Sequence, residues 1–195
     1  MFNYSEACAR NQQPIYAALA DKLAGIESVL ELGSGSGQHA LHFSAQLPHL
    51  IWQCSDTTAY LEALKRNLSQ SDTSSFAEPL LLDVNQQWPA QRFDMIYTAN
   101  SLHIMSWDSV LNLFAQLKGH LSKDGLFCCY GPFKYQGEFT SASNAQFELW
   151  LKGRDPLSGV RDFEALQQLG DKNGLRLIDD IKMPANNQLL IWQSV

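Results

Sequence analysis

A glycine-rich stretch near the start of the chain has the residue types of a cofactor-binding turn. Residues 29–32, three of them apolar, are typical of the end of a buried strand, and Gly33, Gly35 and Gly37 follow at alternate positions. Glycine lets a backbone turn sharply and lets a ligand approach without an intervening side chain. An amphipathic run over residues 37–46 predicts a helix directly afterwards, and free N–H groups at a helix start favour a carboxylate or phosphate. The stretch therefore predicts a cofactor cradle.

Three acidic residues indicate which cofactor this cradle holds. Glu31 lies two residues before the first glycine, Asp56 follows the next predicted strand, and Asp83 follows the one after that. A carboxylate after the second strand is placed to accept both hydroxyls of a ribose, and Asp83 can accept from an adenine amino group. The pattern resembles the class I S-adenosylmethionine (SAM) methyltransferases. The cofactor contacts expected from this resemblance are Glu31, Gly33, Ser34, Gly35, Asp56, Asp83, Val84 and Asn100.

Two other functions stay open at this point. A nicotinamide-dependent oxidoreductase would carry the fingerprint Gly-x-Gly-x-x-Gly, but its last glycine is replaced here by Gln38. The chain also leaves little room for a separate substrate domain. A non-catalytic SAM-binding module that acts through a protein partner is the other alternative, and turnover of SAM would distinguish it from an enzyme.

Candidate catalytic residues follow the fourth and fifth predicted strands. Methyl transfer from SAM is an in-line displacement that depends mainly on orientation, and a base is needed only when the acceptor must lose a proton. His103 is the candidate base, and Asn100 and Tyr130 are expected to face the acceptor. His39 and His42 share one face of a predicted helix but lack a third ligand at a sensible spacing. We therefore expect no metal site, and we interpret both as partly exposed helix residues.

Composition narrows the class of protein and of partner. The 195 residues, 45% of them hydrophobic, predict one domain over residues 1–195 with a well-buried core. The formal charge of −6, with 14 Lys and Arg residues in no dense run, disfavours nucleic acid and favours a small-molecule acceptor. No apolar run approaches the roughly 20 residues of a membrane span, and no signal pattern opens the chain. We expect a cytoplasmic protein, and its oligomeric state stays open.

Alternating apolar strands and amphipathic helices predict an α/β fold. Strands are expected over residues 28–32, 50–55, 80–82, 93–99, 126–130, 175–182 and 188–192, and helices over 14–24, 37–46, 58–70, 107–121 and 162–172. This order predicts a Rossmann-like, seven-stranded, mostly parallel sheet with helices on both faces and an antiparallel last strand. Ligands of such sheets bind beyond the carboxyl ends of the strands.

Three connecting segments carry expectations of their own. Pro14 is expected to open the first helix, so that residues 10–12 form a polar lead-in. Residues 69–75 are rich in Ser, Asp and Thr and predict a loop. Residues 131–159 are expected to form a functional excursion with one short helix at 144–152, and the pair Asn186 and Asn187 could line an acceptor pocket with it.

Motifs along nearly the whole chain resemble the methyltransferase-like protein twenty-six family. They include Arg10-Asn11-x-x-Pro14-Ile15, Glu31-x-x-Ser34-Gly35-x-Gly37-x-His39-Ala40, Ala99-Asn100-x-x-His103-Ile104, Tyr130-Gly131-Pro132-Phe133, Arg154-Asp155-Pro156 and Met183-Pro184-Ala185-Asn186-Asn187. The resemblance implies a SAM-dependent fold and SAM binding, with Arg10 and Asn11 as further cofactor contacts. It implies no particular acceptor, because the family is known chiefly as a domain of unknown function.

Overall fold

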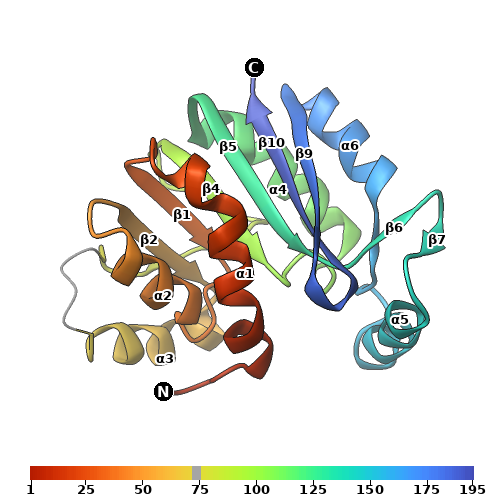
Figure 1. Cartoon of the computed structure of the whole chain (residues 1–195), viewed down its shortest axis with the longest axis horizontal. Coiled ribbons are helices and arrows are strands. Elements are labelled where there is room, and N and C mark those ends of the chain that lie inside the picture. Colours follow the sequence, from red (N-terminus) through yellow and green to blue (C-terminus); the bar gives the residue numbers. More distant parts are fainter. Residues whose placement is uncertain (72–75) are drawn as a thin grey trace.

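A seven-stranded sheet forms the centre of the computed structural model, which describes residues 1–71 and 76–195 (Figure 1). Its strands lie in the order β3-β2-β1-β4-β5-β10-β9, and only β10 runs antiparallel to the others. The bounds are β1 Ser28–Leu32, β2 Ile51–Asp56, β3 Leu80–Leu81, β4 Phe93–Ala99, β5 Leu121–Gly131, β9 Leu175–Met183 and β10 Asn187–Ser194. The predicted Rossmann-like α/β fold with an antiparallel last strand is confirmed. Part of the loop predicted over 69–75 lies outside the described residues.

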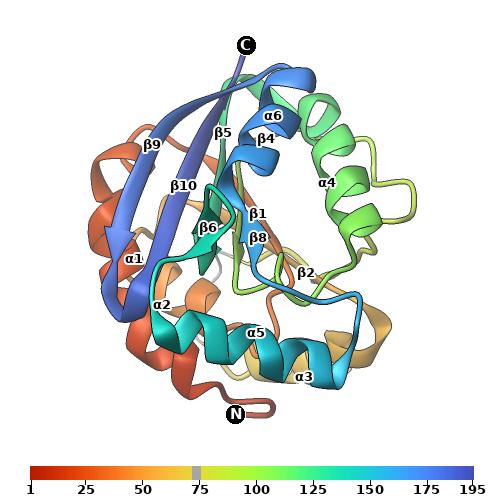
Figure 2. The same ribbon diagram turned by 90° about the vertical axis from the view of Figure 1, so that its right-hand side faces the viewer.

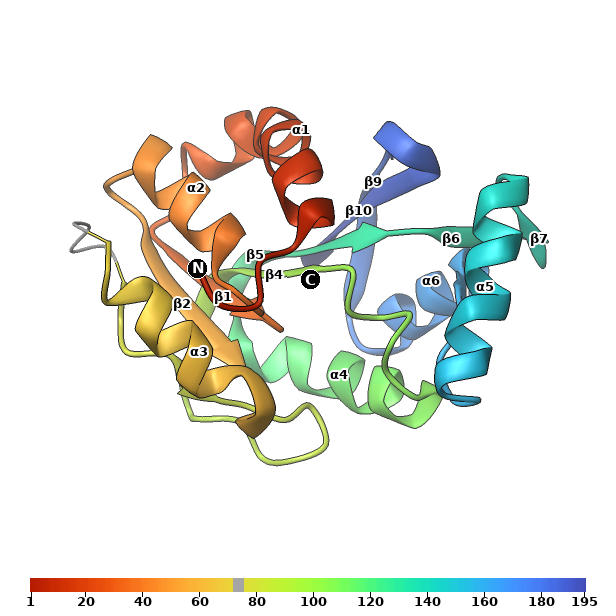
Figure 3. The ribbon, with the colours of Figure 1, turned by 90° about the horizontal axis from the view of Figure 1, so that it is seen from below.

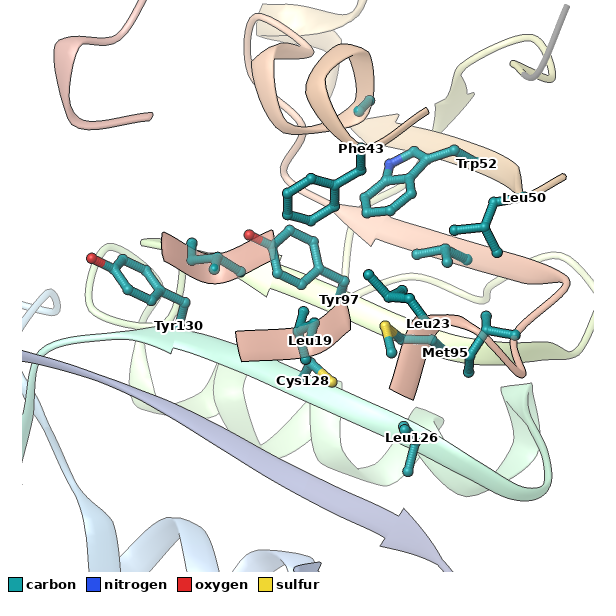
Figure 4. Close-up of a cluster of buried hydrophobic side chains, with 14 of the residues drawn as sticks. Leu19, Leu23, Phe43, Leu50, Trp52, Met95, Tyr97, Leu126, Cys128 and Tyr130 are labelled. Atoms are coloured by element: carbon teal, nitrogen blue, oxygen red, sulfur yellow. The ribbon is translucent and has the colours of Figure 1, made fainter. Parts of the chain in front are cut away.

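Helices cover both faces of this sheet, as Figure 3 shows from below. One face carries α1 (Glu6–Leu23), α2 (Gln38–Gln46) and α3 (Thr58–Leu68); the other carries α4 (Trp107–His120) and α6 (Phe163–Lys172). Figure 4 shows the core of the first face, where leucines of α1 and Phe43 of α2 pack against the aromatic rings of Trp52 and Tyr97. Burial on both faces explains why the central strands read as continuous apolar runs.

Helix α1 begins eight residues earlier than Pro14. Ser5 is its N-cap and accepts a hydrogen bond from the Cys8 N–H at 3.3 Å. The prediction that Pro14 opens the helix is wrong, because the cap and the buried side chains of Ile15 and Leu19 stabilise a helix around the proline. Residues 10–12 are therefore not a lead-in. They are held on a helix, which places Arg10 and Asn11 rigidly beside the sheet.

Strand β5 also begins earlier than predicted. Residues 122–125, which precede the strand predicted over 126–130, are included in β5, and the pairing of β5 with β4 shifts register between Phe93 and Met95. Such an irregularity lets a strand continue through a locally distorted segment. The carboxyl end of β5, which bears Tyr130, agrees with the strand predicted over residues 126–130.

The excursion after β5 contains more structure than the predicted short helix. Strands β6 (Phe133–Tyr135), β7 (Glu138–Phe139) and β8 (Arg161–Asp162) form a second sheet, and α5 (Ala142–Arg154) lies below it in Figure 2. The helix was predicted, though shorter. Two- and three-residue strands have too few positions to show a period, so the small sheet was missed.

The buried guanidinium of Arg161 ties the excursion to the loop that follows β4. Its Nε donates to the Leu102 carbonyl at 3.0 Å, and one Nη donates to the carbonyls of Met105 and Leu157. The loop after β4 is therefore fixed by a residue that lies far away in the sequence. Among the described residues, no helix is both long enough and apolar enough to cross a membrane.

Candidate functional site

Two cavities open at the carboxyl ends of the strands. We call the first the loop cavity, of about 310 Å³, which is lined by Leu32, Gly33, Asp56, Thr57, Tyr60, Leu82, Asp83, Val84, Asn85, Ser101, Ile104, Met105 and Ser109. The second, the hairpin cavity, of about 490 Å³, is lined by Ala7, Arg10, Asn11, Pro14, Asn100, Tyr130, Pro184, Ala185 and Asn187. Asn100 and Ser101 are adjacent in the chain but line different cavities, so the segment after β4 lies between the two.

Asp56 forms part of the wall of the loop cavity. Its Oδ2 accepts a hydrogen bond from the Gly35 N–H at 2.7 Å, and its Oδ1 accepts one from the Thr57 N–H at 2.7 Å. Burial raises the pKa of Asp56, and these backbone donors act in the opposite direction. The carboxylate is thus oriented over the glycine turn, where its remaining lone pairs can accept from a ligand's hydroxyl groups.

Asp83 and Val84 lie in the same cavity as Asp56. Asp83 Oδ1 accepts from the Asn85 N–H at 2.9 Å and from Asn85 Nδ2 at 3.0 Å, so the residue also caps a turn. Tyr60 and Ile104 complete the walls and are 47% and 53% exposed. Sequence reasoning missed both. One signal could have found Tyr60: it is an aromatic residue in the first turn of the helix that follows Asp56, and it lies outside the apolar face of that helix.

The glycine turn adopts backbone conformations that favour glycine. Gly33, Gly35 and Gly37 have φ values of 70°, 56° and 79°. A Cβ on Gly33 would lie 2.9 Å from Ser101 Oγ, so β1 and the segment after β4 approach closely here. Ser34 secures the turn to β2, because its N–H donates to the Ser55 carbonyl at 3.0 Å.

Gly37→Ala should destabilise the fold more than Gly35→Ala. Both residues have positive φ, which costs an alanine about 1–2 kcal/mol. A Cβ on Gly37 would also lie 3.1 Å from side-chain carbons of Leu64 and Leu68, whereas nothing lies within 4 Å of one on Gly35. Urea unfolding of the two variants measures the difference. Equal losses would contradict a packing role for Gly37 against α3.

The polar side chains that line the hairpin cavity include no carboxylate. Arg10 makes no salt bridge with any described residue. Asn100 has φ 58°, and its N–H donates to the Tyr130 carbonyl at 2.8 Å. The turn between β9 and β10 closes the cavity with Ala185 and Asn186 at φ 58° and 57°. Strained backbone of this kind is common at functional sites.

The Asn144 side chain holds this strained turn from α5. Its Nδ2 donates to the Asn186 carbonyl at 2.9 Å. The excursion after β5 therefore supports the hairpin cavity, as well as the loop that it contacts through Arg161.

The predicted site residues divide into three groups. The loop cavity brings together Gly33, Asp56, Asp83 and Val84. The hairpin cavity brings together Arg10, Asn11, Asn100 and Tyr130. Neither cavity is lined by Glu31, Ser34, Gly35 or His103. Glu31 is 2% exposed, and its Oε2 accepts from Trp52 Nε1 at 3.0 Å. Its carboxylate therefore lies in the interior, where it contacts Trp52 and His39.

Two of the three histidines singled out by the sequence, His103 and His39, are buried. Burial lowers the pKa of His103 to about 4, with the Arg161 charge as a second cause, so its imidazole is neutral at neutral pH. Its ring meets that of Phe147 edge to face at 5.1 Å. The interpretation of His39 as a partly exposed helix residue is wrong: its side chain lies between α2, α1 and β1 and is buried. In the described parts of the chain, no cluster of three or more potential metal ligands occurs.

The chain matches one protein family over nearly its whole length and resembles several solved methyltransferase structures. The family described as "Protein of unknown function (DUF938)" matches residues 2–194. Similar solved structures include an O-methyltransferase family protein from Burkholderia thailandensis, 18% identical with a TM-score of 0.81, covering 97% of this chain and 57% of that one. Human N-acetylserotonin methyltransferase in complex with SAM is 15% identical, with a TM-score of 0.81, and the match covers 97% of this chain and 53% of that one.

The mitomycin 7-O-methyltransferase MmcR is a third similar structure, 16% identical with a TM-score of 0.78, covering 99% of this chain and 59% of that one. At these identities the likeness shows a shared fold. The chain spans little more than half the length of these methyltransferases.

Proposed function

We propose that this chain, which belongs to the DUF938 family of proteins of unknown function, is a SAM-dependent methyltransferase with a small-molecule acceptor. Residues 1–195 would form one such catalytic unit, related more narrowly to the methyltransferase-like protein twenty-six family. The fold shared with O-methyltransferases supports this proposal, and so does the human neighbour determined with SAM.

One observation carries the proposal. The Asp56 carboxylate, the Gly33 backbone and the Asp83-Val84 pair share a cavity at the carboxyl ends of β1, β2 and β3. A carboxylate beside a glycine turn suits a ribose diol, and a second carboxylate next to an apolar wall suits an adenine ring with its amino group. We assign the adenosine part of SAM to the loop cavity, between Tyr60 and Ile104.

The methionine part of SAM would then extend past Asn100 toward the hairpin cavity. Arg10 and Asn11 can hold its carboxylate there, which assigns them the cofactor role that the sequence suggested. SAM supplies the methyl group as an electrophile. The protein orients the two reactants and excludes water, and orientation of this kind can contribute about 7–11 kcal/mol to lowering a barrier.

Asn100 and Tyr130 are the proposed acceptor-facing residues, since both line the hairpin cavity. His103 lies behind Gly131, where its Nδ1 would be 3.7 Å from a Cβ added to that glycine. His103 remains the candidate base, and it would reach the acceptor only through a water molecule or through movement of the segment after β5. Its neutral imidazole can accept a proton, although a pKa of about 4 makes it a weak base.

Calorimetric titration with SAM and S-adenosylhomocysteine tests the cofactor assignment, with NADH as the comparison ligand. We expect micromolar binding of the first two and none of NADH. Incubation with SAM and fractionated metabolites then tests turnover by release of S-adenosylhomocysteine. Binding without turnover in any fraction would favour the alternative, a non-catalytic SAM-binding module. Absence of binding would contradict both.

Arg10→Met should weaken S-adenosylhomocysteine about fivefold and leave 5′-methylthioadenosine unaffected. The second ligand lacks the amino-acid carboxylate, and a partly exposed charge pair contributes up to about 1 kcal/mol. Arg176→Met, on β9, is the control, because its side chain contacts Gln193 away from both cavities. An equal effect on the two ligands would contradict a contact between Arg10 and the cofactor's carboxylate.

A further inference from the structure

A buried arginine holds the loop that forms one wall of the loop cavity. Arg161, at the start of β8, is 9% exposed and makes no salt bridge with any residue that the structure describes. Its guanidinium donates instead to the backbone carbonyls of Leu102, Met105 and Leu157. Removing a charge from water costs several kcal/mol unless other groups replace its hydrogen bonds. The guanidinium and the loop carbonyls therefore depend on each other.

The contact between loop and excursion extends over four successive loop residues, 102–105. Between the two carbonyls that the guanidinium holds, the His103 carbonyl accepts from the Gly159 N–H at 2.8 Å. The Ile104 carbonyl accepts from Ser158 Oγ at 3.1 Å. Figure 3 shows this loop, between β4 and α4, reaching toward the lower end of α5. Each of the four carbonyls thus accepts a hydrogen bond from the excursion.

The loop makes a single turn before the next helix starts. The N–H groups of Ile104 and Met105 both donate to the Ser101 carbonyl, at 3.1 and 3.2 Å, and α4 begins only after its N-cap, Ser106. The last carbonyls of a helical turn have no partner within that turn. The excursion supplies these partners, so the path of the loop depends on residues that lie 54–59 positions later in the chain.

The same loop presents two apolar side chains to the loop cavity. Ile104 and Met105 both line it. Ile104 is 53% exposed, although its N–H and its carbonyl are both hydrogen bonded. Its backbone is therefore fixed while its side chain is left uncovered. Binding pockets are largely preformed, with mostly apolar walls, and a wall that is ordered in advance spares the ligand the cost of ordering it.

We propose that Arg161 is a positioning residue of the cofactor site: it holds Ile104 and Met105 in place as the wall against which the adenine ring of the cofactor packs. This role rests on the proposed function, which assigns the adenosine part of SAM to the loop cavity. Arg161 lines neither cavity itself, so it acts on the ligand only through the loop.

Arg161→Met removes the guanidinium and leaves an unbranched apolar side chain in its place. We expect S-adenosylhomocysteine and 5′-methylthioadenosine each to bind about tenfold more weakly in calorimetric titration, because two wall side chains must then be ordered on binding. Both ligands carry the adenine ring, so the two losses should be equal. The Arg10→Met variant differs, since its expected loss is confined to the ligand with the amino-acid carboxylate.

Arg92→Met is the matched control. Arg92 Nη1 donates to the carbonyls of Lys118 and Leu121, so this is a second guanidinium that holds backbone carbonyls. It lies at the amino end of β4, whereas the loop held by Arg161 follows the carboxyl end of that strand. We expect Arg92→Met to lower stability in urea unfolding and to leave the affinity for both ligands unchanged.

Ser158→Ala is a milder variant that keeps the test open if Arg161→Met does not fold. It removes one donor, the hydroxyl that binds the Ile104 carbonyl, and should weaken both ligands about threefold. Amide hydrogen exchange reads the loop directly. The N–H groups of Ile104 and Met105 should exchange faster in either variant than in the wild type, and bound S-adenosylhomocysteine should slow them again.

Wild-type affinity for both ligands in folded Arg161→Met and Ser158→Ala variants would overturn the positioning role. A loss confined to S-adenosylhomocysteine would also overturn it, because the effect would then lie at the carboxylate end of the ligand. An equal loss in Arg92→Met would do the same, since it would indicate general destabilisation. Failure of the wild-type protein to bind either ligand would reject the proposed function and the positioning role with it, so the wild-type titration separates the two failures.

Discussion

Asp56→Ala is expected to weaken SAM binding about a hundredfold. Two ribose hydroxyls would donate to this carboxylate, and a hydrogen bond to a charged group contributes about 1.5–3 kcal/mol. The structure adds a second reason. Asp56 also accepts from the N–H groups of Gly35 and Thr57, so its removal releases the glycine turn that the cofactor contacts. Calorimetric titration of the variant with SAM and S-adenosylhomocysteine measures the loss.

Asp94→Ala is the matched control for this experiment. Asp94 Oδ2 accepts from the N–H groups of Glu27 and Ser28, both at 3.1 Å, at the opposite end of β1. Its removal takes away a carboxylate with the same kind of backbone contacts, far from the loop cavity. We expect lower stability with unchanged SAM affinity. Wild-type affinity in a folded Asp56→Ala variant would contradict the ribose assignment.

Acidification should destabilise the wild-type protein through His103. The pKa of this imidazole is about 4 in the folded protein, against 6.5 in an unfolded chain. Between these values the unfolded chain binds the additional proton, so stability is complete above the unfolded pKa and is lost as the pH falls through the window. From pH 7.5 to pH 5 the expected loss is about 2 kcal/mol.

His103→Gln removes this proton uptake and keeps a polar side chain of similar size. Urea unfolding at both pH values should show a loss about 2 kcal/mol smaller than in the wild type. His49→Gln is the control, because His49 is exposed. The raised pKa of Asp56 acts in the opposite direction, but it is common to all three proteins and cancels in the comparison. Identical pH dependence of wild type and His103→Gln would contradict a buried neutral histidine.

The positions of the strands along the chain and the cofactor turn could be predicted because their signals are local. Apolar runs bounded by Gly33 and Asp56 mark where strands end, and in a parallel sheet those ends meet at one edge. The joint placement of Gly33, Asp56, Asp83 and Val84 follows from this rule alone. The start of α1 was harder to locate, since Pro14 is a strong local signal that capping at Ser5 and packing of Ile15 overrode.

The amino-acid sequence by itself determined the α/β class, the positions of the strands along the chain and the half of the site built from strand ends. Only the tertiary structure decided that Arg10 and Tyr130 share one cavity while Glu31 and His39 lie beneath it. The physical reason is the range of the interactions. Strand and turn propensities act between neighbours in sequence, whereas a buried carboxylate and its imidazole partner meet only when α2 packs against β1.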